Sequence, residues 1–321
     1  MSGTEGEAAQ ISVVVPVHDE ERSVALLLDE IRSALEPLER GWEAIFVDDG
    51  STDGTFSALT RLHARNPEVR VVRLRRNFGK AAALMAGFAQ AEGETVVTLD
   101  GDLQDDPAEI PRLLAKLDEG FDVVSGWKVK RRDPWHRRVL SRIFNAVASR
   151  MSGIRLHDMN CGLKAYRAEV AGGMRVYGEL HRFLPLLAHY QGYRVAELPV
   201  NHRPRSHGHS RYGVERYVRG FLDLLSVSFM SRYRHRPLHL FGGLGLLLGF
   251  AGFAILVYLT VLKATGSSIG GRPLLILGVL LVVVGLQFFS LGLISELVTS
   301  HHEERAGERE RSRRHVEEVL R

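Results

Sequence analysis

The sequence predicts an α/β domain with a mainly parallel sheet, followed by two C-terminal transmembrane helices. Three observations lead to this prediction. Short apolar runs alternate with helical patterns in the first part of the 321-residue chain, acid-rich segments follow several of these runs, and two long stretches near the C-terminus lack charge. Alternating strands and helices are typical of a parallel sheet with helices on its faces. An uncharged apolar stretch of about 20 residues can cross a bilayer.

The first predicted strand is Ile11–Val17, a continuous apolar run of the kind found in strands buried on both faces. A helix is predicted over Ser23–Glu36, where apolar residues recur at helical spacing, and Pro37 ends it. The same alternation continues beyond this helix. Further strands are predicted at Ala44–Val47, Val69–Leu74, Thr95–Leu99 and Asp122–Ser125, with helices near Lys80–Ala91 and Pro107–Glu119.

Acid-rich segments follow three of the predicted strands: His18-Asp19-Glu20, Asp48-Asp49 and Asp100-Gly101-Asp102. Because ligands of open α/β sheets bind at the carboxyl ends of the strands, we expect these segments to converge. Two carboxylates two residues apart, as in Asp100 and Asp102, can hold a hard divalent cation against diphosphate oxygens. A carboxylate such as Asp49 can accept a hydrogen bond from a nucleobase N–H or a ribose hydroxyl. Ordinary surface turns are the alternative for each segment taken alone.

The two uncharged stretches are Leu238–Leu262 and Leu274–Ser295, which contain no Asp, Glu, Lys or Arg. Buried core helices are the alternative, but helices this uniformly apolar rarely suit a soluble fold. Arginines precede the first stretch and follow the second, whereas the loop between them holds only Lys263 and Arg272. The positive-inside rule therefore places both termini in the cytoplasm and the short loop outside. We expect an integral, multi-pass protein of the plasma or inner membrane.

The charge, the cysteine content and the N-terminal residues argue against a nucleic-acid-binding protein, a disulfide-bonded protein and a cleaved signal peptide. The net charge of +4 suits a membrane surface or phosphate-bearing ligands, and without a zinc-finger or RNA-binding motif we expect no nucleic-acid partner. Cys161 is the only cysteine, so an intrachain disulfide is excluded. The first ten residues have no basic and apolar signal pattern, so we expect no cleaved signal peptide.

Two further segments mix arginines with apolar residues at roughly helical spacing: Trp135–Met151 and Tyr212–Tyr233. Basic amphipathic helices of this kind lie well on anionic lipid headgroups. A soluble helix with a solvated basic face is the alternative, chiefly for the first segment. The second leads directly into the first uncharged stretch, which favours a position at the membrane interface.

Six motifs occur in order along the chain. They are VVVPVHDEE (Val13–Glu21), VDDGSTDGT (Val47–Thr55), RNFGKAAAL (Arg76–Leu84), LDGDLQDDP (Leu99–Pro107), HDMNCGLKAYR (His157–Arg167) and ELPVNHRPRSHGHSRYG (Glu197–Gly213). Together they resemble glycosyltransferase family 2. Within that family the chain is most similar to the polyisoprenyl-phosphate glycosyltransferases, such as dolichyl-phosphate mannose synthases and bactoprenol glucosyltransferases, and the resemblance runs from about Ile11 to Ser300.

The resemblance implies a GT-A fold, a divalent cation (Mg²⁺ or Mn²⁺) and inversion at the anomeric carbon. It implies transfer of a sugar from a nucleotide-diphospho-sugar to a polyprenyl phosphate, of undecaprenyl or dolichyl type, at the cytoplasmic membrane face. Such a reaction belongs to cell-envelope glycan biosynthesis. The implied partners are the nucleotide sugar, the polyprenyl phosphate and the lipid bilayer, and the resemblance is compatible with a homo-oligomer.

The resemblance also assigns the donor site, residue by residue. Asp100, Asp102 and Gln104 are implied to bind the metal and the diphosphate. The family often has Tyr where this chain has His18, which leaves the preferred base open. The implied nucleoside pocket consists of Pro16, His18, Glu20 and Asp49, and a loop that closes over the diphosphate contributes Arg205, Ser210 and Arg211.

Asp158 matches the family's candidate catalytic carboxylate, and with Asp102 it makes up the expected catalytic pair. A phosphate monoester has a second pKa of about 6 and is largely ionised near neutral pH. The acceptor oxygen is then already nucleophilic and needs little deprotonation. Asp158 is therefore expected either to act as a general base or only to orient the substrates.

An anionic acceptor needs cations beside the anionic donor. The candidates for binding the acceptor phosphate are Lys128, Arg131, Arg138 and Arg142, which lie in or near the first amphipathic segment. Lys128 and Arg142 match positions assigned to the acceptor phosphate in the dolichyl-phosphate enzymes. General attraction to lipid headgroups is the alternative for each of these cations.

Two other functions compete with this interpretation. A processive polysaccharide synthase would share the catalytic fold, but the chain lacks a Gln-x-x-Arg-Trp motif and has only two predicted spans. A catalytically inactive membrane adaptor would keep the fold, but the acidic motif residues are intact. The expected organisation is a catalytic domain (1–210), an amphipathic interfacial region (211–237), a two-span anchor (238–300) and a charged cytoplasmic tail (301–321).

Overall fold

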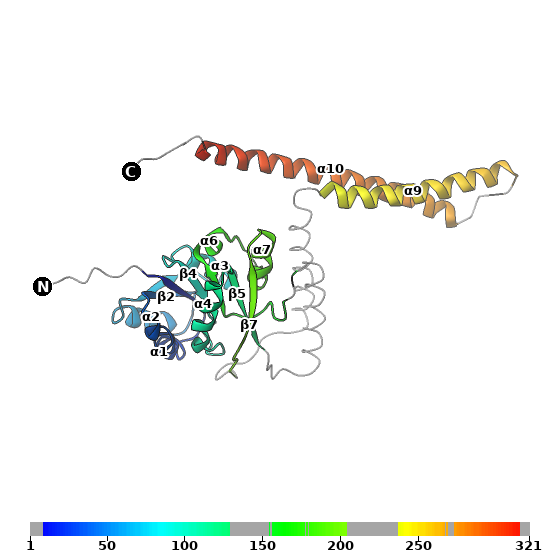
Figure 1. Cartoon of the computed structure of the whole chain (residues 1–321). Coiled ribbons are helices and arrows are strands. Elements are labelled where there is room, and N and C mark those ends of the chain that lie inside the picture. The colour runs from blue at the N-terminus through cyan, green and yellow to red at the C-terminus, as the bar shows by residue number, and fades with distance from the viewer. Residues whose placement is uncertain are drawn as a thin grey trace. The chain divides into compact units, whose positions relative to one another are not determined.

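The computed structural model describes residues 9–128, 154, 156–176, 178, 180–203, 237–266, 268 and 273–314 (Figure 1). The chain divides into two compact units, Met1–Ser228 and Phe229–Arg321. The first unit contains the α/β domain, and the second contains two long helices.

A seven-stranded sheet forms the centre of the first unit, in the order β3-β2-β1-β4-β6-β5-β7. Every neighbouring pair is parallel except the two pairs that β6 makes with β4 and β5. The predicted, mainly parallel sheet is therefore confirmed. The strands are β1 (Ile11–Val17), β2 (Trp42–Asp48), β3 (Val69–Arg73), β4 (Thr95–Thr98), β5 (Val123–Lys128), β6 (Lys164–Arg167) and β7 (Val195–Val200).

Helices cover both faces of this sheet. On β1, Val13 and Val15 belong to one hydrophobic cluster and Val14 to another, because successive side chains of a strand point to opposite faces. The first cluster includes residues of α1 (Val24–Leu35), α2 (Thr55–His63) and α4 (Ile110–Asp118), and the second includes residues of α3 (Lys80–Phe88) and α7 (Leu184–Tyr190). The shorter helices are η1 (Glu36–Leu38), η2 (Pro107–Glu109), α6 (Ala168–Gly173) and η3 (Leu180–Phe183).

The strand order changes direction at β1. Strands β2 and β3 lie on one side of β1, and β4 lies on the other. In open α/β sheets, the crevice outside the carboxyl ends of the strands at such a point is the usual ligand site. The segments that follow β1, β2 and β4 begin at this point, and these are the three acid-rich segments of the sequence.

The second unit consists of α9 (Pro237–Ala264) and α10 (Pro273–Arg314). They include two stretches, Pro237–Ala264 and Pro273–Val298, that are long and apolar enough to cross a membrane, with mean hydropathy 2.3 and 2.7. The predicted apolar spans are therefore confirmed as helices. Helix α10 continues without a break into the charged segment, as far as Arg314.

The two long helices pack antiparallel through glycines. A Cβ atom added to Gly245 would lie 2.6 Å from the carbonyl oxygen of Gly285, and one added to Gly252 would lie 2.6 Å from that of Gly278. Such distances leave no room for a side chain, so the backbones touch. Small residues permit this close approach of helices in a lipid environment, where van der Waals packing drives their association.

Replacing Gly285 with leucine should destabilise the helix pair, because the new side chain meets the backbone of α9. Overpacking of this kind costs about 1–3 kcal/mol. Gly243→Leu is the matched control, since a Cβ atom there meets nothing within 4 Å. Thermal unfolding in detergent measures the difference. Equal melting temperatures for the two variants would show that the glycine contact contributes little.

Candidate active site

The segments after β1 and β2 are joined by hydrogen bonds. The backbone N–H of Asp49 donates to the carbonyl of Val17 (2.9 Å), and His18 Nδ1 lies 3.0 Å from the carbonyl oxygen of Asp49. Further along, the N–H of Glu20 donates to Thr55 Oγ1 (2.8 Å). The sequence-predicted residues Pro16, His18, Glu20 and Asp49 therefore lie on adjoining segments at the carboxyl end of the sheet.

The segment after β4 reaches the same place. A Cβ atom on Gly101 would lie 2.7 Å from Val17 Cγ1 and 3.2 Å from the carbonyl oxygen of Pro16, so Gly101 packs directly against the end of β1. All three acid-rich segments are thus brought together at the strand ends, where the sequence led us to expect them.

The carboxylate of Asp49 shapes the start of α3. Its side chain is buried, and its two oxygens accept the backbone N–H groups of Phe78 (2.7 Å) and Gly79 (2.9 Å). Next to it, Gly50 has φ +67° and lies so close to Arg76 that a Cβ atom would overlap that backbone. Asp49 was expected to contact the nucleoside; in the structure its carboxylate holds the segment that leads into Lys80.

Lys80, the first residue of α3, donates a hydrogen bond to Asp100 Oδ1. Burial alone would raise the pKa of the Asp100 carboxyl, but the ammonium groups of Lys80 and Lys128 outweigh it and lower the pKa to about 2. Asp100 also lies against Gly162, where a Cβ atom would be 2.4 Å from Asp100 Oδ1. The segment that carries Asp158 therefore adjoins the candidate metal site.

A tight turn follows Asp100. Leu103 has φ +60°, and Asp102 Oδ1 accepts the backbone N–H of Gln104 at 3.2 Å. Asp106 then caps η2 by accepting the N–H of Ala108 (3.1 Å), and Pro107 begins the helical turn, as its position in the sequence predicts. The turn places Asp100, Asp102 and Gln104 on one short loop, and the side chains of Asp102 and Gln104 are half-buried.

Lys128, expected to bind the acceptor phosphate, has a partner inside the protein. Its Nζ lies 2.8 Å from Asp105 Oδ1, and the two side chains are 12% and 1% exposed. Burial alone would lower the pKa of Lys128, but the charge of Asp105 outweighs it and keeps the pKa above its ordinary value. Lys128 is therefore a protonated, nearly buried cation beside the loop Asp100–Asp106, which we call the metal loop after its candidate ligands.

Asp158 is held by two strands. The backbone N–H groups of His157 and Asp158 both donate to the carboxylate of Glu197 on β7 at 2.8 Å, and His157 Nδ1 lies 2.9 Å from Glu197 Oε2. On the other side, the ring of Trp127 on β5 stacks on His157 with 4.1 Å between ring centroids. The Asp158 side chain is 1% exposed, and its Oδ1 accepts the N–H of Asn160 (3.0 Å).

Sequence reasoning did not single out several residues of this site, among them Lys80, Lys164 and Glu197. Lys164 is 4% exposed on β6 and donates to the carbonyl of Cys161; burial lowers the pKa of its ammonium group. All three residues lie in the motifs quoted above, and Lys164 also stands out as a lysine inside a short apolar strand pattern, Leu163–Tyr166. Burial also raises the pKa of the Cys161 thiol to about 12, which leaves it unreactive.

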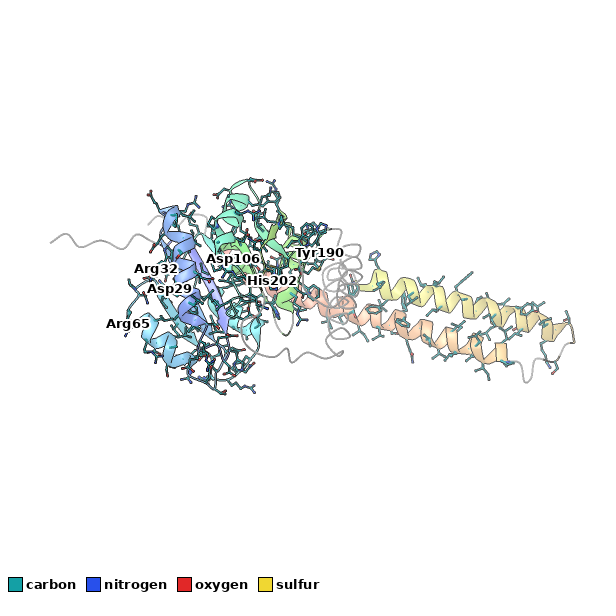
Figure 2. All side chains as sticks on the ribbon, turned by 90° about the horizontal axis from the view of Figure 1, so that it is seen from below. Asp29, Arg32, Arg65, Asp106, Tyr190 and His202 are labelled. Carbon is teal, nitrogen blue, oxygen red and sulfur yellow. The ribbon has the colours of Figure 1, made fainter. Side chains whose placement is uncertain are left out.

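Hydrogen bonds and ion pairs join the segment that follows β7 to the metal loop. The backbone N–H of Arg203 donates to the carbonyl of Gln104 (2.9 Å), and His202 Nδ1 lies 3.1 Å from the same oxygen. The Arg203 guanidinium also pairs with Asp106 at 2.8 Å and with Glu30 at 2.7 Å. Figure 2 shows His202 and Asp106 lying close together. Arg203, the last described residue before the predicted diphosphate loop, therefore lies directly beside the candidate metal ligands.

The other predicted site residues lie outside the described part of the chain. These are Arg131, Arg138 and Arg142 for the acceptor phosphate, and Arg205, Ser210 and Arg211 for the donor diphosphate. Both predicted amphipathic segments, Trp135–Met151 and Tyr212–Tyr233, lie outside it as well. The assignments of these residues stay predictions.

Comparison with known proteins identifies similar sequences and folds. Residues 12–173 match the family "Glycosyl transferase family 2". The chain is 40% identical over 298 residues to dodecaprenyl-phosphate galacturonate synthase of Rhizobium johnstonii, covering 91% of this chain and 88% of that protein. It is 38% identical over 290 residues to undecaprenyl-phosphate 4-deoxy-4-formamido-L-arabinose transferase of Edwardsiella ictaluri, covering 90% and 88%.

Solved structures show the same fold. Glucosyl-3-phosphoglycerate synthase from Mycobacterium tuberculosis, in complex with Mn²⁺, uridine-diphosphate-glucose and phosphoglyceric acid, matches with a TM-score of 0.52 and 22% identity. The match covers 68% of this chain and 80% of that chain. The complex of the same enzyme with phosphoglyceric acid matches with a TM-score of 0.53, 23% identity and the same coverage. This likeness confirms the expected GT-A type of fold.

Proposed function

Because the chain belongs to glycosyl transferase family 2, we propose that it transfers a sugar from a nucleotide-diphospho-sugar to a polyprenyl phosphate. One observation carries the proposal: two relatives named for sugar transfer to polyprenyl phosphates align with about nine tenths of the chain. Alignments this long take in both the α/β domain and helices long enough to cross a membrane. A membrane anchor suits a lipid acceptor, because the polyprenyl chain stays in the bilayer and the anchor keeps the enzyme beside it.

The residues after β4 suit a divalent cation. Asp100, Asp102 and Gln104 offer hard oxygen ligands on one loop, which is the donor set that Mg²⁺ and Mn²⁺ prefer. Among the residues that the structure describes, no cluster of three His, Cys, Asp or Glu side chains could hold a metal ion. A cation bound at this loop supplies positive charge that stabilises the departing diphosphate.

The transfer itself is a single displacement. A non-bridging oxygen of the acceptor phosphate attacks the anomeric carbon, the bond from that carbon to the donor's diphosphate oxygen breaks, and the electron pair leaves with the nucleoside diphosphate. Attack opposite the leaving group inverts the anomeric configuration. We assign Asp158 the task of orienting the reacting groups. Its burial and its bond to the N–H of Asn160 suit a fixed orienting group, and an ionised acceptor needs no base.

The decisive experiment is incubation of the detergent-solubilised protein with polyprenyl phosphate and a panel of nucleotide sugars, followed by mass analysis of the lipid. We expect one sugar added per lipid phosphate and one nucleoside diphosphate released. Lipid carrying several sugars would favour the processive synthase. Absence of any glycosylated lipid across the panel, from protein that is folded, would favour the inactive adaptor.

We further propose that the α/β domain and both termini face the cytoplasm, since arginines flank the outer ends of both apolar stretches. A topology reporter fused after Arg321 should register as cytoplasmic, and one inserted beside Ser267 should register as external. Signals from the same side would contradict a pair of membrane-spanning helices.

A further inference from the structure

Three lysines from three different elements surround Asp100: Lys80 on α3, Lys128 on β5 and Lys164 on β6. Two of them have their own buried partners. Lys128 pairs with Asp105 at 2.8 Å, and Lys164 donates to the carbonyl of Cys161. Their side chains are almost fully enclosed, whereas the Lys80 side chain is 32% exposed and binds Asp100 itself. Of the three, Lys80 is therefore the one with room to leave its carboxylate.

The position of Lys80 allows its ion pair with Asp100 to be exchanged for another partner. Lys80 is the first residue of α3, and the partial positive charge of a helix N-terminus disfavours a cation there. The carboxylate of Asp100 offsets this repulsion. The N–H groups of Phe78 and Gly79 just before the helix already bind Asp49, but the ammonium group of Lys80 can itself pair with an anion such as a phosphate group. A diphosphate placed at the neighbouring metal loop would thus offer Lys80 a second partner.

A divalent cation at Asp100 competes with Lys80 directly. The ammonium group occupies Oδ1, and a metal ion that takes this oxygen comes within a few ångströms of the ammonium, where like charges repel strongly at low dielectric. The repulsion falls when the negative diphosphate lies between or beside the two cations. Metal binding and nucleotide binding are therefore coupled through this one lysine.

We propose that Lys80 is an exchangeable counter-ion of the metal site, which neutralises Asp100 until a divalent cation arrives with the donor and then moves to the diphosphate. This inference rests on the metal site of the proposed function. It adds that the free enzyme binds the cation weakly because Lys80 occupies Asp100, and that metal and nucleotide bind together rather than in succession.

The test is a titration of the full-length protein in detergent with Mn²⁺ alone, following free Mn²⁺ by electron paramagnetic resonance. Lys80→Met and Lys80→Gln remove the charge and should bind Mn²⁺ more tightly than the wild type, by about tenfold or more. Lys80→Arg keeps the charge and should bind like the wild type. Lys116→Met is the matched control, because Lys116 has a similarly exposed side chain, 29%, and pairs with Glu119 on the surface.

The proposal is overturned if both neutral variants, folded by circular dichroism, bind Mn²⁺ no more tightly than the wild type. Using two neutral variants guards against misfolding of one, since Gln can still donate a hydrogen bond to Asp100. Asp102→Asn, titrated alongside, separates this result from failure of the proposed function. If Asp102→Asn weakens Mn²⁺ binding while the Lys80 variants change nothing, the metal site stands and only the counter-ion role is wrong.

Discussion

Replacing Asp102 with asparagine should lower the rate of sugar transfer by about a hundredfold or more, the usual cost of losing an electrostatic stabiliser of a leaving group. Asp102 is half-buried, and its Oδ1 accepts the backbone N–H of Gln104. Asparagine is nearly isosteric and can keep that hydrogen bond, so the loop should keep its shape. The expected loss is therefore one of charge at the proposed metal site rather than of fold.

Chelation provides an independent measurement of the same effect. Excess chelator should abolish transfer by the wild-type protein, and adding back Mg²⁺ or Mn²⁺ should restore it. The Asp102→Asn variant should stay slow even at the cation concentration that saturates the wild-type protein. Asp29→Asn is a suitable control, because the Asp29 side chain is 71% exposed on α1 (Figure 2). Unchanged transfer in excess chelator would reject a metal-dependent reaction.

Replacing Glu197 with alanine should slow transfer by a comparable factor, because Glu197 holds the segment that carries Asp158. Its carboxylate binds the backbone N–H groups of His157 and Asp158 and the ring of His157. Without it, the segment carrying Asp158 can shift, and a displacement of about 1 Å in a positioning group can cost roughly a hundredfold in rate. The unpaired N–H groups should also cost about 1–3 kcal/mol of stability.

Three measurements identify a positioning effect of Glu197. The turnover rate should fall while the KM for the nucleotide sugar changes little, because the predicted donor contacts lie outside the segment that carries Asp158. Glu197→Gln keeps one acceptor oxygen for both N–H groups and should lose less activity than Glu197→Ala. Glu119→Ala, at a surface ion pair with Lys116, should leave transfer unchanged. If Glu197→Ala retained full activity at a temperature where it is folded, Asp158 would not depend on this contact.

The ion pair of Lys128 with Asp105 refines the proposal for the acceptor. Asp105 is buried in the loop that carries Asp102 and Gln104, so Lys128 joins β5 to the candidate metal ligands. A phosphate that binds Lys128 has to share its ammonium group with the carboxylate of Asp105. Acceptor binding at Lys128 would then be coupled to the conformation of the metal loop, whereas Arg142 stays a predicted acceptor contact outside the described residues.

The sequence by itself determined the local features of the protein. Continuous apolar runs such as Ile11–Val17 predicted buried parallel strands, because strands covered on both faces have no polar side. Uncharged stretches long enough for a bilayer predicted both C-terminal helices. The order of strands and turns also indicated that Asp49, Asp100 and Asp102 would gather at one end of the sheet. The strands and helices follow from neighbours in the chain, so periodicity and composition were sufficient for them, and the gathering of the three acids follows from the general rule for open α/β sheets.

Only the tertiary structure decided which distant residues meet. Strand β6 lies antiparallel between β4 and β5, a placement that depends on pairing across the sheet rather than on local pattern. Lys80 reaches Asp100 across 20 residues, and Glu197 reaches Asp158 across 39. Such contacts arise from the packing of whole elements. The sequence around a lysine or glutamate in a strand or at the start of a helix does not indicate which distant residue it will contact. The candidate ligands of the metal site follow from the motif, whereas the charges and hydrogen bonds that hold them follow from the fold.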